Sequence, residues 1–325
     1  MSRERKFSKP FDLSHSILFN EFPAIYTSTI GVPGFFVKKI NRRVHLKDGT
    51  GGEMDSAYIA NPDYKQLFER VAVGLEHQSA PVSDEKLNKF GDYDIQLVAD
   101  EHLPTLLVVA SHLNEEKSKN KLIRSPSDIT QLYFVDLAEE NISQRLSTVS
   151  KIIYNNQYLS QELALNLGVI GLYAPREHAC EIMETVVDLY IHIVADLDLA
   201  MEYTLYSVIT ILLDAFFDDE NEYGRLTKMI DEKTSKESKM HFASHESTIK
   251  SLAYAEEDLA RTEDDLAHAK DDLAHAKDDL ARTEDDLAHA KDDLARTKDD
   301  LAKANGKIAD LEEEVKRLTN ELNGK

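Results

Sequence analysis

The chain of 325 residues has a formal net charge of -22, 42% hydrophobic residues, one cysteine and no tryptophan. The single cysteine excludes an intrachain disulfide, and the acidic balance argues against tight non-specific binding to nucleic acid. Acidic residues interrupt the most apolar region, residues 186–217, so we expect no membrane span. The lone cysteine fits a reducing compartment, so we expect a cytoplasmic location.

Short segments rich in Val, Ile, Tyr and Phe, which is the composition of strands, dominate the first part of the chain. The predicted strands are GFFVKKI, MDSAYIA, VAVGLE, PTLLVVAS and ITQLYFVDL. Between the third and the fourth, residues 83–102 begin with acidic capping residues and continue with apolar residues at helical spacing, which predicts a helix.

A basic cluster surrounds the end of the first predicted strand and consists of Lys38, Lys39, Arg42, Arg43 and Lys47. These side chains either contact phosphates or form an exposed strand face.

The pattern becomes helical after residue 139. The predicted helices cover residues 140–155, 158–167, 176–195 and 199–217. The predicted organisation is therefore an α/β core over 1–139, a helical extension over 140–233, a polar linker over 234–253 and a coiled coil over 254–325.

From Ala255 onward the sequence repeats every seven residues, with a leucine or another branched apolar residue once in each repeat. A strict repeat of this length predicts a left-handed coiled coil. With that residue at position a, position d holds alanine or threonine until Leu311 and Leu318 occupy it. We interpret the segment as a stalk that makes the protein a homo-oligomer. The alternative is a solvated helix without a defined partner.

The segment VAVGLEHQ, residues 71–78, is typical of a buried strand that ends in a carboxylate, an imidazole and an amide. Because side chains alternate along a strand, Glu76 and Gln78 share one face and His77 points to the other. A symmetric hairpin centred near 65–66 places Asp55 of the preceding strand directly opposite Glu76, on the same face. Asp63 is a rival acid, although it lies in the turn itself.

Two facing carboxylates repel each other unless a positive group lies between them. A hard divalent cation such as Mg²⁺ fills this role well, because it prefers oxygen ligands. The alternative is a pair of surface acids, each solvated or matched by Lys or Arg.

Residues 50–113 resemble the core of the PD-(D/E)XK nuclease-like transposases, and more narrowly the recombination-promoting nuclease group. Four features occur in the same order as in that group: an aspartate on one strand, a strand ending in EHQS, a following helix, and a strand that opens at LP and runs through valines. The resemblance implies a restriction-endonuclease-like mixed sheet flanked by helices.

The resemblance also implies a metal-dependent DNA endonuclease in which Asp55, Glu76 and the backbone carbonyl of His77 bind Mg²⁺. Gln78 occupies the place where the wider superfamily has a lysine; it can orient water but supplies no positive charge. Lys86 and Lys89, on the following predicted helix, are candidates for that charge, and solvated positions on the helix face are the alternative.

Two functional hypotheses follow. The first is a Mg²⁺-dependent DNA endonuclease, multimerised by its tail, that acts in DNA rearrangement or in defence against foreign DNA. The second is a catalytically inactive nuclease fold that serves as an oligomeric scaffold or regulatory protein.

Overall fold

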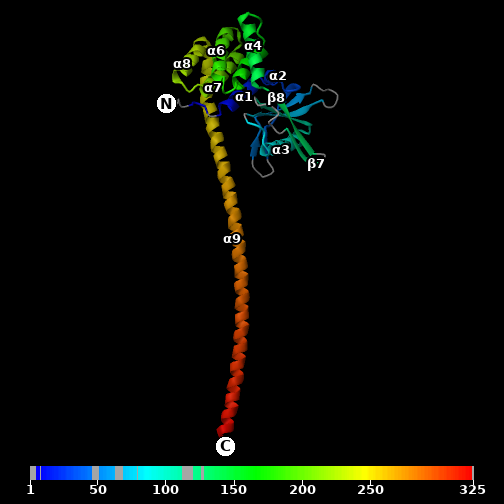
Figure 1. Ribbon diagram of the computed structural model, residues 1–325, viewed down its shortest axis with the longest axis vertical. Helices are drawn as coiled ribbons and strands as arrows, with labels where there is room; N and C mark the ends of the chain where they lie inside the picture. Colours follow the sequence, from blue (N-terminus) through cyan, green and yellow to red (C-terminus); the bar gives the residue numbers. More distant parts are fainter. Residues whose placement is uncertain are drawn as a thin grey trace. The chain divides into compact units, whose positions relative to one another are not determined.

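The computed structural model describes residues 5–7, 9–45, 51–62, 69–78, 80–111, 120–125 and 128–323. It divides into two units, Met1–Glu257 and Asp258–Lys325, and each is described by itself. The first unit combines a sheet with a group of helices (Figure 1). Its strands are β1 (Phe35–Lys39), β2 (Arg43–His45), β3 (Gly51–Glu53), β4 (Ser56–Asn61), β5 (Val71–Gln78), β6 (Thr105–Ser111), β7 (Lys121–Ser125) and β8 (Asp128–Asp136).

In the first unit, helix α3 lies between strands β5 and β6 in the chain, and the other helices lie before the first strand or after the last. The helices are α1 (Pro10–Glu21), α2 (Pro23–Ile30), α3 (Asp84–Glu101), α4 (Glu139–Tyr154), α5 (Gln161–Leu172), α6 (Ala179–Ile193), α7 (Leu199–Phe216) and α8 (Glu220–Lys233), with a short 3₁₀ turn at Val194–Asp196. Helix α9 (Lys236–Asn323) begins in the first unit and continues as the second.

The main sheet has six strands in the order β1-β4-β5-β6-β8-β7. Strands β5, β6 and β8 are parallel in its centre, and antiparallel pairs flank them: β1 with β4, β4 with β5, and β7 with β8. Helix α3 forms the crossover between the parallel strands β5 and β6, as such a connection requires. The sequence therefore predicts the mixed α/β class correctly.

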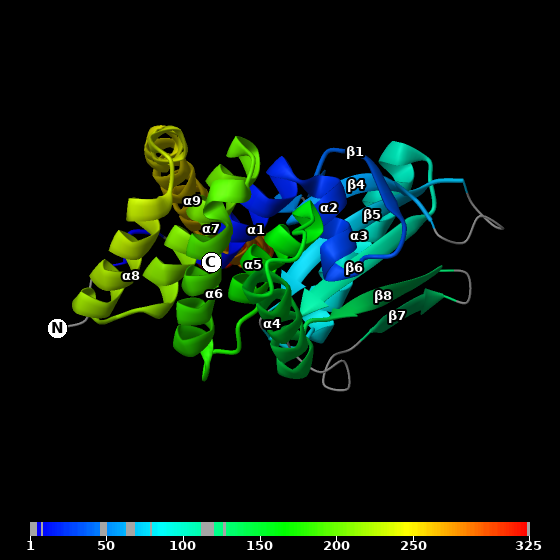
Figure 2. The same cartoon turned by 90° about the horizontal axis from the view of Figure 1, so that it is seen from above.

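The central strands β4, β5 and β6 are buried on both faces, and successive residues along them enter different cores. Ala57, Ala72 and Leu107 lie in a small core with helix α3. Tyr58 and Val73 lie in the large core that the remaining helices complete. Figure 2 shows helices α4–α8 gathered beside the sheet. The predicted α/β region over 1–139 and the predicted helical region over 140–233 share this large core.

The five predicted strands correspond to β1, β4, β5, β6 and β8, and the helix predicted over 83–102 is α3. The hydroxyl of Ser83 accepts a hydrogen bond from the Lys86 N–H and so caps that helix. The later predicted helices correspond to α4, α5, α6 and α7, with α5 starting at Gln161 rather than 158. Helices α1, α2 and α8 were not predicted.

Helix α7 is, within the described part of the chain, the one helix that is long and apolar enough to span a membrane. Most of its apolar window is buried inside the protein, which is the environment of a core helix in a soluble protein. The acids within 186–217 therefore do not exclude a span by composition, since α7 passes this test despite Glu202 and Asp214; the burial of α7 is the observation that argues against one.

The predicted polar linker over 234–253 is wrong, because α9 already begins at Lys236. The buried carboxylate of Glu202 accepts hydrogen bonds from the Ser235 N–H at 2.5 Å, the Ser235 hydroxyl at 2.8 Å and the Ser238 hydroxyl at 2.9 Å. Phe242 is buried one turn later against the rings of Phe7 and Tyr206. The serines that suggest a loop therefore anchor the first turns of a helix.

The second unit is the continuation of α9, which remains helical through Gly306. The apolar residues at position a of the heptads are about half exposed from Leu273 onward. The long C-terminal helix expected from the heptads is therefore present.

Candidate active site

The strand pair β4 and β5 brings Asp55 and Glu76 together. Ser56 pairs with Leu75 in an antiparallel ladder, so the residues directly beyond this pair are Asp55 and Glu76, the register predicted from the sequence. The main-chain N–H of Asp55 donates to Glu76 Oε1 at 3.3 Å, and the N–H of His77 donates to Asp55 Oδ2 at 2.7 Å. Each carboxylate thus accepts a hydrogen bond from a main-chain N–H of the neighbouring strand segment.

Both acids lie on the sheet face that α3 covers. The alternation along the strands places Asp55 with Ala57, and Glu76 with Ala72 and Gly74. Helix α3 and Met54 fill the space beside these small residues: a Cβ on Gly74 would lie 2.8 Å from Leu107 Cδ2 and 2.9 Å from Met54 Sδ. Small residues are therefore needed here for close packing beneath the acid pair.

A lysine from α3 reaches the end of β5. Lys86, in the first turn of α3, donates a hydrogen bond from Nζ to Gln78 Oε1. Gln78 is buried, and its main-chain carbonyl accepts from the Ser111 hydroxyl at 2.9 Å. Of the two candidate lysines, Lys86 therefore places its ammonium group next to the neutral Gln78. The Lys89 ammonium lies 5.5 Å from the centroid of the Tyr93 ring.

Burial and mutual repulsion make both carboxylates easier to protonate. Burial raises the pKa of Asp55 to about 6, and Asp12 adds to the rise, while the His77 N–H, Arg42 and Lys86 oppose it. Burial also raises the pKa of Glu76 well above its usual range, and the charge on Asp55 adds to this effect. Lys89 and Lys86 oppose the rise at Glu76. A closely bound cation would favour the charged form of both groups.

The basic cluster lines a hollow beside Asp55. Its volume is about 370 Å³, and its walls include Asn20 of α1, Lys39, Arg42, Arg43 and Asp55. The Lys39 ammonium donates to the carbonyl and to the side-chain oxygen of Asn20, at 3.0 and 2.9 Å. Lys38 is exposed on β1, and Lys47 lies outside the described residues, as does the rival acid Asp63.

The guanidinium of Arg42 contacts two other residues that line this hollow, Glu53 and Asp55. It lies 2.7 Å from Glu53 Oε1 and donates to the main-chain carbonyl of Asp55 at 3.2 Å. Arg43 is more exposed and lies 4.0 Å from the same Glu53 oxygen. The arrangement holds one cationic side chain next to the acid pair and leaves another in solvent.

The opposite face of the same strands carries a network of neutral rings. His77 contacts Tyr173, at the end of α5, through Nδ1, and its ring centroid lies 3.6 Å from that of His15. His15 contacts the Tyr26 hydroxyl at 3.0 Å and the Ser56 hydroxyl at 2.9 Å. Because Ser56 follows Asp55 and His77 follows Glu76, helices α1 and α5 hold the residues beside both acids.

Burial lowers the pKa of His77 to about 3 and lowers the pKa of His15 well below its usual range. Both imidazoles are therefore neutral at physiological pH and place no positive charge behind the carboxylates. The Nε2 atom of His77 is buried and has no hydrogen-bond partner among the described residues. The sequence predicts the face on which His77 lies, but His15 and Tyr173 carry no local signal and were not predicted.

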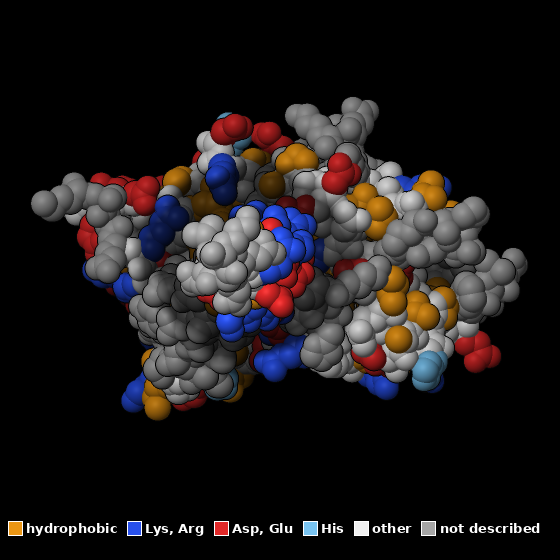
Figure 3. All heavy atoms as spheres, turned by 90° about the horizontal axis from the view of Figure 1, so that it is seen from below, with side chains coloured by type: hydrophobic (Ala, Val, Ile, Leu, Met, Phe, Trp, Pro, Cys, Tyr) orange, Lys and Arg blue, Asp and Glu red, His pale blue; other side chains and the backbone are white. Residues whose placement is uncertain are grey.

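The described residues contain no group of three or more His, Cys, Asp or Glu side chains arranged to hold a metal ion. The site brings together two carboxylates, those of Asp55 and Glu76. Acidic and basic side chains are interspersed on the face shown in Figure 3, among the residues that the structure describes. Comparison with known proteins finds no matching family model, no matching curated protein and no matching solved structure.

Proposed function

We propose that the protein is a Mg²⁺-dependent DNA endonuclease whose first unit has the restriction-endonuclease-like fold of the recombination-promoting nuclease group. The observation that carries the proposal is the contact between Asp55 and Glu76 at the end of a strand pair, with Lys86 close by. Asp55 immediately precedes β4, and the strand that ends in EHQ, the helix and the valine-rich strand follow as β5, α3 and β6.

The acid pair supplies the oxygen ligands in this proposal. Asp55 Oδ2 and Glu76 Oε1 accept main-chain hydrogen bonds, which fix both carboxylates and leave Asp55 Oδ1 and Glu76 Oε2 without a partner among the described residues. These oxygens, together with the His77 carbonyl, are the ligands that we propose for the cation. A bound Mg²⁺ supplies an activated water and neutralises charge that grows on the phosphate.

Gln78 and Lys86 act as a pair at the position beside the acids. The amide of Gln78 orients water, and the Lys86 ammonium adds the positive charge that the amide lacks. Developing negative charge on a phosphate is stabilised by a fixed cation in a partly dry site. The hollow with Lys39, Arg42 and Arg43 then binds the neighbouring phosphates of the strand.

A net charge of -22 weakens the binding of DNA to any single copy. Self-association through a coiled coil in α9 raises the effective concentration of a second active site once the first is engaged. We therefore propose a cytoplasmic homo-oligomer that acts on DNA during rearrangement or defence against foreign DNA.

Nicking of supercoiled plasmid tests the proposal. Wild type should nick the plasmid with Mg²⁺ or Mn²⁺ and lose the activity in EDTA. Asp55→Asn should be inactive, and Lys86→Ala should nick at least tenfold more slowly, with partial recovery in Lys86→Arg. Asp100→Asn, which changes an exposed acid at the other end of α3, is the matched control and should keep full activity.

The second candidate is a catalytically inactive nuclease fold that serves as a scaffold. The hydrogen bonds between the two strands favour this candidate. Glu76 binds the main-chain N–H of Asp55, and Asp55 binds the main-chain N–H of His77, so both carboxylates have a structural role without any cation. Absence of nicking by wild type with every divalent metal would favour the scaffold. Equal nicking by wild type and Asp55→Asn would place the activity elsewhere.

A further inference from the structure

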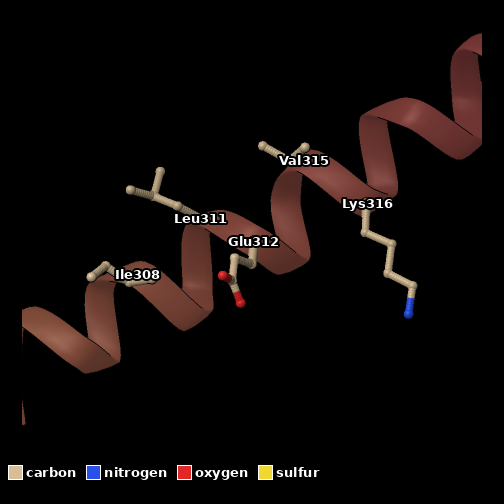
Figure 4. A pocket seen from close by; sticks show the side chains of 5 residues that line it. All are labelled: Ile308, Leu311, Glu312, Val315 and Lys316. Carbon is tan, nitrogen blue, oxygen red and sulfur yellow. The ribbon is translucent and has the colours of Figure 1, made fainter.

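The apolar stripe of α9 is exposed to solvent along the part of the helix whose side chains the structure describes. Between Leu273 and Leu318, the residues at position a and the two leucines at position d are 49% to 64% exposed. Figure 4 shows Ile308, Leu311 and Val315 projecting to one side of the helix, with Glu312 and Lys316 directed away from them. A seam of this kind, repeated every seven residues, is complementary to itself.

The charges that flank the seam distinguish the two orientations of a second copy. In parallel coiled coils, position g of one helix lies near position e of the next heptad in the other; in antiparallel coiled coils, g lies near g and e near e. In the heptads whose side chains the structure describes, position g is an aspartate four times in succession: Asp279, Asp286, Asp293 and Asp300. An antiparallel pair therefore places aspartate next to aspartate along this stretch.

A parallel pair brings opposite charges together instead. Asp286 then faces Lys291, and Asp293 faces Lys298, once from each copy. Lys307 likewise faces Glu312 of the second copy. Among the heptads with described side chains, one pair, Asp279 with Glu284, is repulsive. Within each helix, Arg296 also lies 4.0 Å from Asp293, but both side chains are about 80% exposed, so this contact is weak.

The last heptads specify the register. Ile308, Leu311, Val315 and Leu318 form the stretch in which both a and d carry large apolar residues. A slip by one or more heptads moves part of this stretch against alanine or threonine at d, such as Ala304, and removes apolar contacts. We infer that a second copy of this chain pairs with α9 in a parallel, in-register coiled coil, which places both first units at the same end of the stalk. The inference rests on the proposed self-association and not on the nuclease chemistry.

Disulfide cross-linking of the full-length chain tests the orientation. All variants carry Cys180→Ser, which removes the native, exposed thiol. Ala276→Cys and Ala304→Cys occupy d positions and replace one small residue with another, while Glu313→Cys occupies position f on the outer face as the control. Each variant is oxidised alone at low concentration. In addition, the Ala276→Cys and Ala304→Cys proteins are mixed in equal amounts, kept reduced while their subunits exchange, and then oxidised. The disulfide-linked peptides are identified by mass spectrometry.

The inference predicts a dimer by light scattering, with 304–304 and 276–276 disulfides at least tenfold more abundant than the 313–313 product of the control. A dominant 276–304 disulfide in a dimeric sample would overturn the orientation or the register while leaving self-association intact. A monomer by light scattering, with cross-linking at the control level, would overturn self-association itself. Plasmid nicking by the same samples reports on the nuclease proposal separately.

Discussion

Replacing Asp55 with asparagine removes one negative charge from the acid pair and changes the shape of the side chain very little. The side-chain oxygen of the new asparagine can still accept from the His77 N–H, which lies 2.7 Å from Asp55 Oδ2 in the wild type. The main-chain N–H that donates to Glu76 is also unchanged. Any change in stability therefore reports on the buried charge.

The pKa of Asp55 gives the sign and the size of the effect. Burial is the largest cause of its rise from 3.8 to about 6, so the folded chain holds the proton more tightly than the unfolded chain. The free energy of unfolding then falls as pH rises from about 4 through about 6 and stays low above that. At about 1.4 kcal/mol per pH unit, the full shift amounts to about 3 kcal/mol. Because the side chain is partly exposed, we expect Asp55→Asn to gain about 1–2 kcal/mol at pH 7.5.

Urea unfolding at pH 7.5 measures this gain, with EDTA or with 10 mM Mg²⁺ in the buffer. In EDTA, Asp55→Asn should be more stable than wild type. Mg²⁺ should stabilise wild type, because a ligand of the folded state shifts the unfolding equilibrium, and should leave Asp55→Asn unchanged. A variant less stable than wild type in EDTA, or an equal gain from Mg²⁺ in both proteins, would refute the reasoning; Asp100→Asn serves as the charge control.

Three further predictions concern the surroundings of the site. Gly74→Ala should lower the free energy of unfolding in urea by about 1–3 kcal/mol, because the new Cβ meets Leu107 and Met54. Gly224→Ala in α8, where a Cβ has open space, is the control and should be neutral or stabilising. Equal effects of the two substitutions would contradict the packing argument. Glu202→Ala should lower the free energy of unfolding by about 2–4 kcal/mol and speed amide hydrogen exchange in the first turns of α9, since three hydrogen bonds from Ser235 and Ser238 are lost. Unchanged exchange in those turns would show that Glu202 does not hold the start of α9 in place. The pKa of His77 falls from 6.5 to about 3 on folding, so the proton binds mainly to the unfolded chain and the free energy of unfolding decreases as pH falls below about 6.5. His77→Asn should therefore flatten the pH dependence of the urea midpoint between pH 5 and 7. An unchanged slope would show that His77 does not titrate in this way.

The Asp55–Glu76 register was predictable because it depends on local rules. Strand alternation assigns Glu76 and Gln78 to one face, and a symmetric hairpin relates position 55 to position 76 whatever conformation residues 63–68 adopt. The ladder from Ser56–Leu75 to Ala60–Val71 follows this register. The roles of these residues in binding a metal or in catalysis stay predictions.

Elements whose stability comes from tertiary packing were harder to find. Helix α1 begins after Lys9, which provides no side-chain cap, and its buried His15 is satisfied by Tyr26 and Ser56 rather than by neighbours in sequence. Helix α2 contains Ile25, Thr27 and Thr29, whose β-branched side chains favour strands. Tertiary burial overrides propensity in both cases.

Two other differences have different causes. Helix α8 did carry a local signal, since Asp219 caps it by accepting from the N–H groups of Asn221 and Glu222. The start of α9 carried a misleading one: its serines are typical of a linker, yet they bind a carboxylate that lies on α7, far away in sequence. Sequence patterns alone do not show such a partner.

A crystal structure of the wild-type protein soaked in Mn²⁺ tests the central claim most directly, because the anomalous signal of manganese locates the ion without reference to activity. We predict one strong peak in direct contact with carboxylate oxygens of both Asp55 and Glu76, and its disappearance in crystals of Asp55→Asn. A strong peak elsewhere on the first unit, or no peak between these two side chains at saturating Mn²⁺, would contradict the account.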